Sequence, residues 1–404
     1  MKICVIGAGA QGSVIAKILV EDSEIEKVIL ADINTQLLQR IAKKINSSKL
    51  STERVDAGNS DDLAKILKGA DVVVNATLTY FNAPIFNSAL KHGANYVDFA
   101  EDWPLKEKFF ENLKTSDKWK KAGLTAVKSQ GITPGVTNVL ARYGADRLDK
   151  VEEIHIKSGW TSPSEEKMVP TWSPGWSVET ALLEWTADSI VYENGEYKRH
   201  PPFSGFETHN FPEPMGPQTL CWVEHDEVVT LPYFIGKGVK YVDIKMSPDI
   251  IAGILVNIGL ASSDPIEVKG VKVKPLDVVV KLTKPAIEEF EELEKTPEFH
   301  KLSGEKVYSC NAVQVIGEKA GKKVEQYVYL NTLISDMREW LRRYDTTNGW
   351  VPIPGAATAI MLATGEIQAK GVIAPECLEP EPFLRKLTEM GMGTFQTITK
   401  KQVA

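Results

Sequence analysis

The sequence is poor in cysteine and contains no long hydrophobic run. Its four cysteines, Cys4, Cys221, Cys310 and Cys377, are scattered and form no Cys-X-X-Cys pair. This spacing excludes the usual zinc and disulfide patterns and is typical of a reducing compartment, so we expect no metal site. No apolar stretch reaches the roughly 20 residues that a membrane-spanning helix needs. The chain opens directly on an apolar strand, so we expect no signal peptide and a cytoplasmic location.

An excess of positive charge is also missing. The 404 residues include 54 acidic and 47 basic side chains, which gives a net charge of −7. This balance argues against nucleic acid as the main partner. Hydrophobic residues make up 43% of the chain and charged residues 25%, as in globular proteins. A chain of this length exceeds one ordinary hydrophobic core, so we expect two domains or more.

A glycine-rich loop follows the first predicted strand. The segment KICVIGAGAQG is an apolar strand that runs into Gly-X-Gly-X-X-Gly, and an apolar-periodic helix follows it. The first glycine permits a tight turn, the second lets a pyrophosphate approach, and the third lets helix and strand pack closely. This context predicts a dinucleotide site at the helix start. The alternative is an α/β domain that binds no nucleotide. The predicted contact residues are Gly7, Gly9, Ala10, Gln11 and Gly12.

The second predicted strand, KVILADIN, ends in Asp32, about 20 residues after the last glycine of the loop, as a dinucleotide site requires. A carboxylate here accepts hydrogen bonds from the adenosine ribose and repels a 2′-phosphate. No arginine follows it directly. We therefore predict NAD as the cofactor and regard NADP as the less favoured choice.

Further apolar runs alternate with helical stretches up to residue 130. They predict a Rossmann domain over residues 1–130, with about six parallel strands in a doubly wound sheet. The carboxyl ends of these strands should form the ligand crevice. After the third and fourth strands, the residues predicted to contact the cofactor are Asp56, Ala57, Ala76, Thr77 and Thr79.

The hydrophobic pattern changes in the middle of the chain. Alternating segments such as VEEIHIKSGW, KVYSCNAVQVIG and EQYVYLN predict half-buried strands, the last two paired as a hairpin. Helical stretches are expected near residues 177–188, 276–296 and 333–344. We predict an α+β domain over 131–345, with a mainly antiparallel sheet that supplies substrate contacts and a dimer interface. Residues 346–404 should form helices that return to the Rossmann domain, so the predicted fold class is α/β.

The loop GWTSPSEEKMVPTWSPGW is rich in tryptophan, proline and glycine, which is typical of a lid or binding loop. Trp172 and Trp176 are therefore candidate substrate contacts. The alternative is that they pack into the core or a dimer interface. Core packing is the prediction for Trp185, which lies in a helical pattern.

Four segments, in order, resemble the saccharopine dehydrogenase-like oxidoreductases: TLTYFNAPIFNSALKHGANYVDFAED, GITPGVTNVLA, GWSVETALLEW and ATGEIQAKGVIAPECLEPEPFL. Within that group the last two look most like lysine 6-dehydrogenase. The resemblance implies a homodimeric NAD(P)-dependent enzyme that acts on the carbon–nitrogen bond of an amino acid, with lysine as the first expectation. The alternatives are an enzyme of the saccharopine or carboxynorspermidine type and a non-catalytic NAD sensor.

The same resemblance implies that Tyr80 and the helix start ITPGVTN lie near the substrate. Our hypothesis is that this helix, beginning at Pro134, offers free backbone N–H groups to the substrate carboxylate. The alternative is a helix that only connects the domains. Arg199 is a further candidate, because a guanidinium group binds a carboxylate bidentately. The predicted contacts of the helix start are Thr133, Pro134, Gly135, Thr137 and Asn138.

Oxidation of an amine requires a general base with a pKa near the working pH. The candidates are Tyr80, Asp102 and Asp98. Tyrosine ordinarily titrates near pH 10 and aspartate near 3.9, so either residue type needs a shifted pKa for this work. The alternative role of the two aspartates is to cap the helix that follows them.

Overall fold

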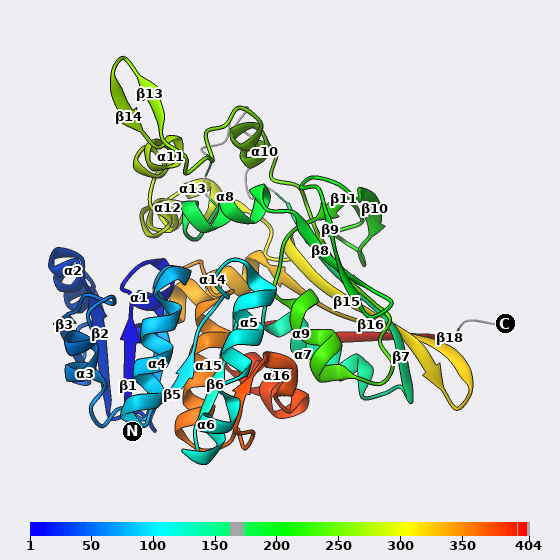
Figure 1. Cartoon of the computed structure of the whole chain (residues 1–404), viewed down its shortest axis with the longest axis horizontal. Helices are drawn as coiled ribbons and strands as arrows, with labels where there is room; N and C mark the ends of the chain where they lie inside the picture. The colour runs from blue at the N-terminus through cyan, green and yellow to red at the C-terminus, as the bar shows by residue number, and fades with distance from the viewer. Residues whose placement is uncertain (162–171, 173, 394, 402–404) are drawn as a thin grey trace.

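The computed structural model describes residues 1–161, 172, 174–393 and 395–401. Two sheets with their covering helices form the body of the protein, and a smaller lobe projects from it (Figure 1). The N-terminal third and part of the C-terminal region build the first sheet. Within the described ranges, no helix has the length and apolar character needed to cross a membrane.

The first sheet is parallel and has seven strands in the order β17-β6-β5-β4-β1-β2-β3. Its central strands are buried on both faces, which explains their continuous apolar sequences. The doubly wound sheet that the sequence predicts is thus confirmed. Its strands are β1 Lys2–Ile6, β2 Lys27–Asp32, β3 Leu50–Arg54, β4 Val72–Asn75, β5 Asn95–Val97, β6 Thr125–Val127 and β17 Gly371–Ile373.

Helices cover this sheet, and two helices of this region come from the far end of the chain. As expected, α15 (Pro352–Ala363) returns to pack against α1. A side chain at Gly355 would lie 2.5 Å from the ring of Phe99, so glycine lets this helix approach the sheet closely. The other helices of this region are α1 Ala10–Glu21, α2 Thr35–Ile45, α3 Ser60–Leu67, η1 Thr79–Phe81, α4 Asn82–His92, α5 Leu105–Leu113, α6 Ser116–Lys121 and α16 Pro380–Glu389.

The second sheet has nine strands and is mainly antiparallel, as predicted; β12 and β7 form its parallel pair. Strands β15 and β16 form the expected hairpin. Helices α7 (Val136–Ala145) and α9 (Glu227–Ile235) pack against this sheet. The strands are β7 Lys150–Trp160, β8 Ser189–Glu193, β9 Glu196–His200, β10 Glu207–Asn210, β11 Pro217–Trp222, β12 Tyr241–Met246, β15 Val307–Lys319, β16 Lys322–Leu333 and β18 Gln396–Lys401.

Two expectations about the C-terminal region need correction. The first sheet gains a seventh strand, β17, from this region, whereas the sequence predicted only helices there. The chain then leaves the Rossmann sheet, because β18 pairs with β16 of the second sheet. Both strands are short, and only pairing with distant strands defines them.

The projecting lobe follows β12 and contains α10 (Ile250–Asn257), the hairpin of β13 (Ile266–Val268) and β14 (Val271–Val273), and α11 to α13. The single helix expected over 276–296 is two helices, because Pro285 cannot continue a helix and lies at the start of the second. Trp185 in α8 (Val178–Thr186) is buried and stacks on Phe203, which confirms its core role. The remaining helices are α11 Pro275–Leu282, α12 Ala286–Leu293, α13 Pro297–Lys301 and α14 Ile334–Tyr344.

Candidate active site

The glycine-rich loop has the shape that a pyrophosphate requires. Gly7 has a φ of +99°, and a Cβ atom there would lie 2.5 Å from the carbonyl oxygen of Ala76. At Gly12 a Cβ would lie 1.8 Å from the carbonyl oxygen of Gly7, so this position admits no side chain. A Cβ at Gly9 would meet nothing within 4 Å. The open side of Gly9, at the start of α1, is therefore where a dinucleotide phosphate fits.

Asp32 lies beside this loop at the end of β2. Its carboxylate accepts hydrogen bonds from the backbone N–H of Ala8 at 2.7 Å and of Asn34 at 2.8 Å. The side chain stays partly exposed, so its remaining lone pairs can accept a ribose hydroxyl. The neighbouring Ile33 is 57% exposed and uncharged. Arg54, the partner of Asp32 in strand register, lies at the end of β3.

The other predicted cofactor contacts surround the carboxyl edge of the first sheet. Ala76 and Thr77 follow β4, and the Thr77 hydroxyl donates to Asn75 at 2.6 Å. Thr79 begins η1, Ala10 begins α1, and Asp56 and Ala57 follow β3. Gln11 connects distant segments, because its amide donates to the Gly175 carbonyl at 3.4 Å and accepts from Asn348 at 3.3 Å.

Tyr80 lies at this edge but has the wrong electrostatics for a base. Its side chain is 53% exposed. Burial of the remainder and the nearby carboxylate of Glu179 on α8 raise the pKa of Tyr80 above its usual value. A general base needs the opposite shift toward neutrality. Tyr80 therefore suits a contact or donor role better than proton abstraction.

Asp98 is buried and fully engaged. It forms an ion pair with Lys128 and accepts hydrogen bonds from the Ser129 N–H at 2.7 Å and the Tyr96 hydroxyl at 2.9 Å. Glu101 holds the same lysine at 3.3 Å. These contacts tie the ends of β5 and β6 together beneath the crevice. Asp98 therefore has a structural role beneath the site. Its side chain is buried and cannot contact a substrate in this structure.

Asp102 is the more accessible of the two aspartates. It is partly buried, and the Thr79 hydroxyl lies 3.5 Å from its Oδ1 atom. The alternative capping role is not observed, because α5 begins at Leu105 with Pro104 as its N-cap residue. Asp102 thus lies beside Thr79 and stays partly exposed to solvent.

The start of α7 does not offer the free N–H groups that the sequence suggested. The Gly135 N–H donates to the Asn138 side chain at 2.9 Å. The N–H groups of Val136 and Thr137 donate to the carbonyl oxygens of Gly131 and Ile132 at 2.9 and 3.0 Å. The hypothesis of carboxylate binding by these groups is therefore wrong, because the preceding loop folds back and satisfies them. The helix also begins at Val136 rather than Pro134.

The polar side chains of this helix point instead into the protein. The Thr137 hydroxyl donates to Glu227 at 2.8 Å. Asn138 donates to Thr230 at 3.2 Å and to Glu376 at 2.9 Å. Thr133, followed by Pro134, donates to Asn311 at 3.1 Å. The segment thereby joins α9, the second sheet and the C-terminal region.

The contact of Thr137 leads to a group of ionisable residues that the sequence had not singled out. We call Glu184, Glu224, His225, Asp226 and Glu227 the His225 cluster. His225 Nδ1 lies 2.5 Å from Glu227. Asp226 accepts hydrogen bonds from the Ser129 hydroxyl at 3.1 Å and from the Glu101 N–H at 3.2 Å. The cluster therefore touches the end of β6 and lies at the junction of the two sheets.

Burial and neighbouring charges shift the pKa values of four residues of this cluster. Desolvation raises the pKa of Asp226, Glu184 and Glu224 to about 7 in each case. Burial lowers the pKa of His225, but its carboxylate neighbours Glu227, Glu184 and Asp226 outweigh this and raise it to about 9. Carboxyl groups that titrate near neutrality beside a protonated imidazole are typical of a site that binds or moves protons.

A signal for the cluster was present in the sequence. WVEHDEVVTLPYFI carries four consecutive ionisable residues at the start of an otherwise apolar helix. Such residues are rarely buried unless they are paired or functional. Only the fold brings Glu184 of α8 to the same place.

The three remaining substrate candidates are dispersed around the crevice. The Trp172 ring N–H donates to Asp249 at 2.7 Å, so this residue ties the loop to the lobe. Trp176 is 42% exposed. Arg199 lies 3.9 Å from both Glu107 and Glu224, which compete for its charge. The rest of the predicted binding loop, residues 162–171 and 173, lies outside the described residues.

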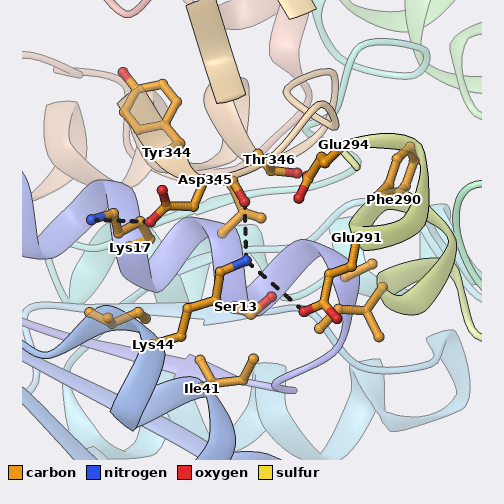
Figure 2. A pocket seen from close by; sticks show the side chains of 14 residues that line it. Ser13, Lys17, Ile41, Lys44, Phe290, Glu291, Glu294, Tyr344, Asp345 and Thr346 are labelled. Atoms are coloured by element: carbon orange, nitrogen blue, oxygen red, sulfur yellow. Dashed lines mark hydrogen bonds and ion pairs between the residues drawn. The ribbon is translucent and has the colours of Figure 1, made fainter. Parts of the chain in front are cut away.

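A separate cavity lies against the outer side of α1, between α2 and α12 (Figure 2). Its volume is about 40 Å³, which admits little more than a water molecule. Lys44 crosses it to the Asp345 carbonyl at 3.2 Å and to Glu291 at 4.0 Å. This cavity is too small for a substrate and marks where the lobe meets the cofactor-binding region.

Comparisons with known proteins agree with this arrangement. Residues 3–127 match the family model described as saccharopine dehydrogenase NADP binding domain, and residues 131–392 match the saccharopine dehydrogenase C-terminal domain. The carboxynorspermidine synthase of Vibrio cholerae is 27% identical, over 97% of this chain and 96% of its own. The carboxyaminopropylagmatine dehydrogenase of Synechocystis is 26% identical, over 98% of each chain.

Two solved structures share the fold along the full chain. Saccharopine dehydrogenase (L-Glu forming) from Saccharomyces cerevisiae has a TM-score of 0.66 at 16% identity and covers 98% of this chain. Homospermidine synthase from Legionella pneumophila has a TM-score of 0.66 at 14% identity and covers 99%. The comparisons cover 99% and 91% of the solved chains themselves, so the similarity in fold extends over nearly the whole length of each protein.

The shifted pKa values predict how the cluster affects stability. Folded Asp226 retains its proton up to about pH 7, whereas the unfolded chain releases it near 3.8. Between these values the folded state binds more protons, so the contribution of Asp226 to the free energy of unfolding falls as the pH rises from about 4 to 7. Asp226→Asn should remove this dependence and reduce the loss of stability between pH 5 and 7.5 by at least about 1 kcal/mol.

Urea denaturation at pH 5, 6 and 7.5 measures this difference. Asp188→Asn is the control, since Asp188 is exposed. Equal pH dependence of wild type and Asp226→Asn would contradict a protonated, desolvated Asp226.

Proposed function

This chain belongs to the saccharopine dehydrogenase family, and we propose that it forms or cleaves the secondary amine of a carboxylated polyamine. Family membership makes it an NAD(P)-dependent oxidoreductase that acts on a CH–NH bond. In the proposed synthetic direction, a polyamine amino group condenses with a carbonyl compound that carries a carboxylate, and the resulting imine is reduced.

The observation that carries this proposal is the surplus of carboxyl groups in the His225 cluster. Four carboxyl groups surround the imidazole of His225 near the end of β6, those of Glu184, Glu224, Asp226 and Glu227. Burial is the main cause that raises the pKa values of Glu184, Glu224 and Asp226, so the ionised carboxylates there lack hydration and require compensation by positive charge. A substrate with several ammonium groups supplies that compensation, and lysine, with fewer, supplies less.

The relatives support the same choice. Two of them are named for reactions on carboxylated polyamines, at 26–27% identity over nearly the whole chain. The first expectation, a lysine 6-dehydrogenase, receives support only at the level of the family. We therefore place the carboxynorspermidine type ahead of it, and keep lysine as a competing substrate in the test.

The residues of this chain have distinct parts in the proposed reaction. The cofactor supplies or accepts the hydride. Glu184 and Asp226 bind and orient the ammonium groups of the polyamine. His225, held by Glu227 and protonated near neutrality, donates a proton as water leaves during imine formation and recovers one in the reverse direction. Asp102, beside Thr79, is the second group available for proton transfer at the crevice.

We infer that the cofactor is NAD. The support is Asp32, whose carboxylate faces the glycine-rich loop and is held there by two backbone N–H groups. A 2′-phosphate at this point would meet a fixed negative charge. The uncharged Ile33 follows it. Arg54 is paired with Asp32 in the register of β2 and β3. Its positive charge would instead favour the 2′-phosphate of NADP.

The substrate proposal predicts which amine supports turnover. Formation of NADH is measured at mildly alkaline pH with carboxynorspermidine, carboxyaminopropylagmatine, saccharopine and L-lysine. We expect a carboxylated polyamine to give a kcat/KM at least about 100-fold above that of lysine, corresponding to about 2.7 kcal/mol of transition-state stabilisation. Turnover confined to lysine would replace the proposal with a lysine 6-dehydrogenase. Tight NADH binding without turnover of any of the four amines would favour the alternative of a non-catalytic NAD sensor.

Glu184→Gln tests the ammonium-binding role directly. The change removes one negative charge and preserves the size of the side chain, so the KM for the polyamine should rise about tenfold while kcat changes less. Steady-state kinetics on both variants give the comparison. Glu196→Gln, on exposed β9, is the matched control. An unchanged KM for Glu184→Gln would contradict the proposed role.

Asp32→Ala tests the cofactor choice. Loss of the carboxylate should weaken NADH binding about tenfold, because a charge-assisted hydrogen bond to the ribose is worth roughly 1.5–3 kcal/mol, and should strengthen NADPH binding relative to NADH. Fluorescence titration with both nucleotides measures the two dissociation constants. Asp277→Ala, in exposed α11, is the control. An unchanged NADPH-to-NADH ratio would remove Asp32 as the determinant.

A further inference from the structure

Glu376 is a buried carboxyl group that the proposed reaction does not use. It lies in η2 (Pro375–Cys377), shortly after β17, and its side chain is 1% exposed. Glutamate is almost never buried to this extent unless it is paired or functional. Its segment, ATGEIQAKGVIAPECLEPEPFL, is one of the four that resemble the family, and Asn138 and Glu184 belong to two of the others. Glu376 contacts Asn138, so the C-terminal segment meets the start of α7 inside the protein.

Glu376 holds two helices together. Helices α7 and α9 lie side by side (Figure 1), and η2 packs against both. The Asn138 amide of α7 donates to Glu376 Oε2 at 2.9 Å and to the Thr230 hydroxyl of α9 at 3.2 Å. The Thr230 hydroxyl also hydrogen-bonds to Glu376. These three side chains form a closed triangle, which we call the Glu376 clamp.

The Glu376 clamp lies directly beside the contact that fixes the His225 cluster. Thr137, which donates to Glu227 Oε1 at 2.8 Å, precedes Asn138 in α7. Glu227 and Thr230 are three residues apart in α9, so they are neighbours on one side of that helix. The other oxygen of Glu227 lies 2.5 Å from His225 Nδ1. Bonds that hold Asn138 to Thr230 therefore also keep Glu227 between Thr137 and His225.

The hydrogen bonds determine which atoms of the clamp donate. The backbone N–H of Gly135 can only donate, and it donates to Asn138 Oδ1 at 2.9 Å. Asn138 Nδ2 therefore faces Glu376 and Thr230, and Glu376 Oε2 accepts. The other oxygen of Glu376, Oε1, is buried and has no hydrogen-bond partner in the described part of the chain. A proton on this carboxyl group belongs on Oε1, so Glu376 keeps the clamp closed in its neutral form.

The surroundings of Glu376 favour that neutral form. Burial raises the pKa of Glu376 to about 7 and outweighs the hydrogen bonds that lower it, and the charge of Glu227 acts in the same direction as burial. Arg142 is engaged elsewhere, because it donates to the backbone carbonyl of Glu376 at 3.2 Å and to Asp146 at 2.7 Å. Burial raises the pKa of the adjacent Cys377 thiol to about 12, so this group is uncharged. An ionised Glu376 would place a second buried negative charge near Glu227, which is unfavourable.

We propose that Glu376 is a positioning residue of the active site, which holds Glu227 against His225 through Asn138 and Thr230. This inference rests on the role of His225 in the proposed function. Without the clamp, Glu227 can leave the imidazole and water can enter. Both changes return the pKa of His225 from about 9 toward its ordinary value of 6.5. The imidazole would then be largely deprotonated at neutral pH and could not donate a proton during imine formation.

The pKa of the His225 ring tests this proposal without any substrate. NMR of the full-length protein with isotope-labelled histidine follows the ring between pH 5 and 10, and His225→Gln identifies the signal. The wild type should titrate near 9. Glu376→Leu removes both oxygens from the clamp, so the pKa of His225 should fall to about 8 or below. Glu376→Gln retains an oxygen for Asn138 and a donor in place of the protonated Oε1, and should keep the wild-type value.

Two further variants separate positioning from packing. Thr230→Val removes only the hydroxyl of the clamp, so it should fold even where Glu376→Leu does not, and should also lower the pKa of His225. Leu378→Ala removes a buried apolar side chain from the segment that follows η2. It should lower the melting temperature and leave the pKa of His225 unchanged. Circular dichroism verifies that each variant folds.

Three results would overturn the proposal. The first is a wild-type His225 that titrates near its ordinary value. The second is an unchanged pKa of His225 in Thr230→Val and in folded Glu376→Leu, which would give Glu376 a purely structural role. The third is a pKa in Glu376→Gln that falls as far as in Glu376→Leu. Failure of the substrate proposal looks different, because no carboxylated polyamine would be turned over while His225 still responded to the clamp. A lowered pKa in Glu376→Leu and Thr230→Val, with Glu376→Gln and Leu378→Ala unchanged, supports the proposal.

Discussion

The desolvation of carboxyl groups at the junction of the two sheets is the constraint on which the site depends. Asp226, Glu224 and Glu227 are held out of water around His225. Burial alone would make this arrangement unfavourable, because an ionised carboxylate loses its hydration there. The protein offsets part of this cost with the imidazole, with the Thr137 and Ser129 hydroxyls, and by allowing several of the groups to retain protons. A cationic substrate can balance the negative charge that the protein itself leaves uncompensated.

The fold brings this cluster to the carboxyl edge of the first sheet, the edge at which doubly wound sheets bind a dinucleotide. The glycine-rich loop, Asp32 and the ends of β4 to β6 lie along the carboxyl edge of the first sheet, as in other doubly wound sheets. Asp226 reaches that edge through Ser129, and Glu227 reaches α7 through Thr137. The ion pair of Lys128 with Asp98 and Glu101 fixes the strand ends beneath them. Direct hydrogen bonds thus join the carboxyl edge of the first sheet to the His225 cluster.

Several residues proved to have parts other than those predicted, for identifiable reasons. Asp98 was one of three candidates for the general base, but it forms an ion pair with the buried Lys128. The start of α7 was expected to bind a carboxylate, but its own loop satisfies its N–H groups. In each case the residue type was suited to the chemistry. The groups concerned were already bound, however, in Asp98 by a residue distant in sequence and at the start of α7 by the local turn. Neither a partner that is distant in sequence nor a turn of this kind produces a repeating pattern of residues that sequence analysis can detect.

Local patterns in the sequence determined the Rossmann sheet, the glycine-rich loop with Asp32, the mixed second sheet and the family, because strand periodicity, turn glycines and motif order depend on near neighbours. The tertiary structure decided what required distant residues to meet. It placed Glu184 of α8 beside the four consecutive ionisable residues at the start of α9, and it added β17 and β18 to different sheets. It also left Ile250 and Ile254 of α10 exposed to solvent. The raised pKa values of Glu184, Glu224 and Asp226 and the exposure of the lobe both depend on how the chain packs, which a local pattern in the sequence does not determine.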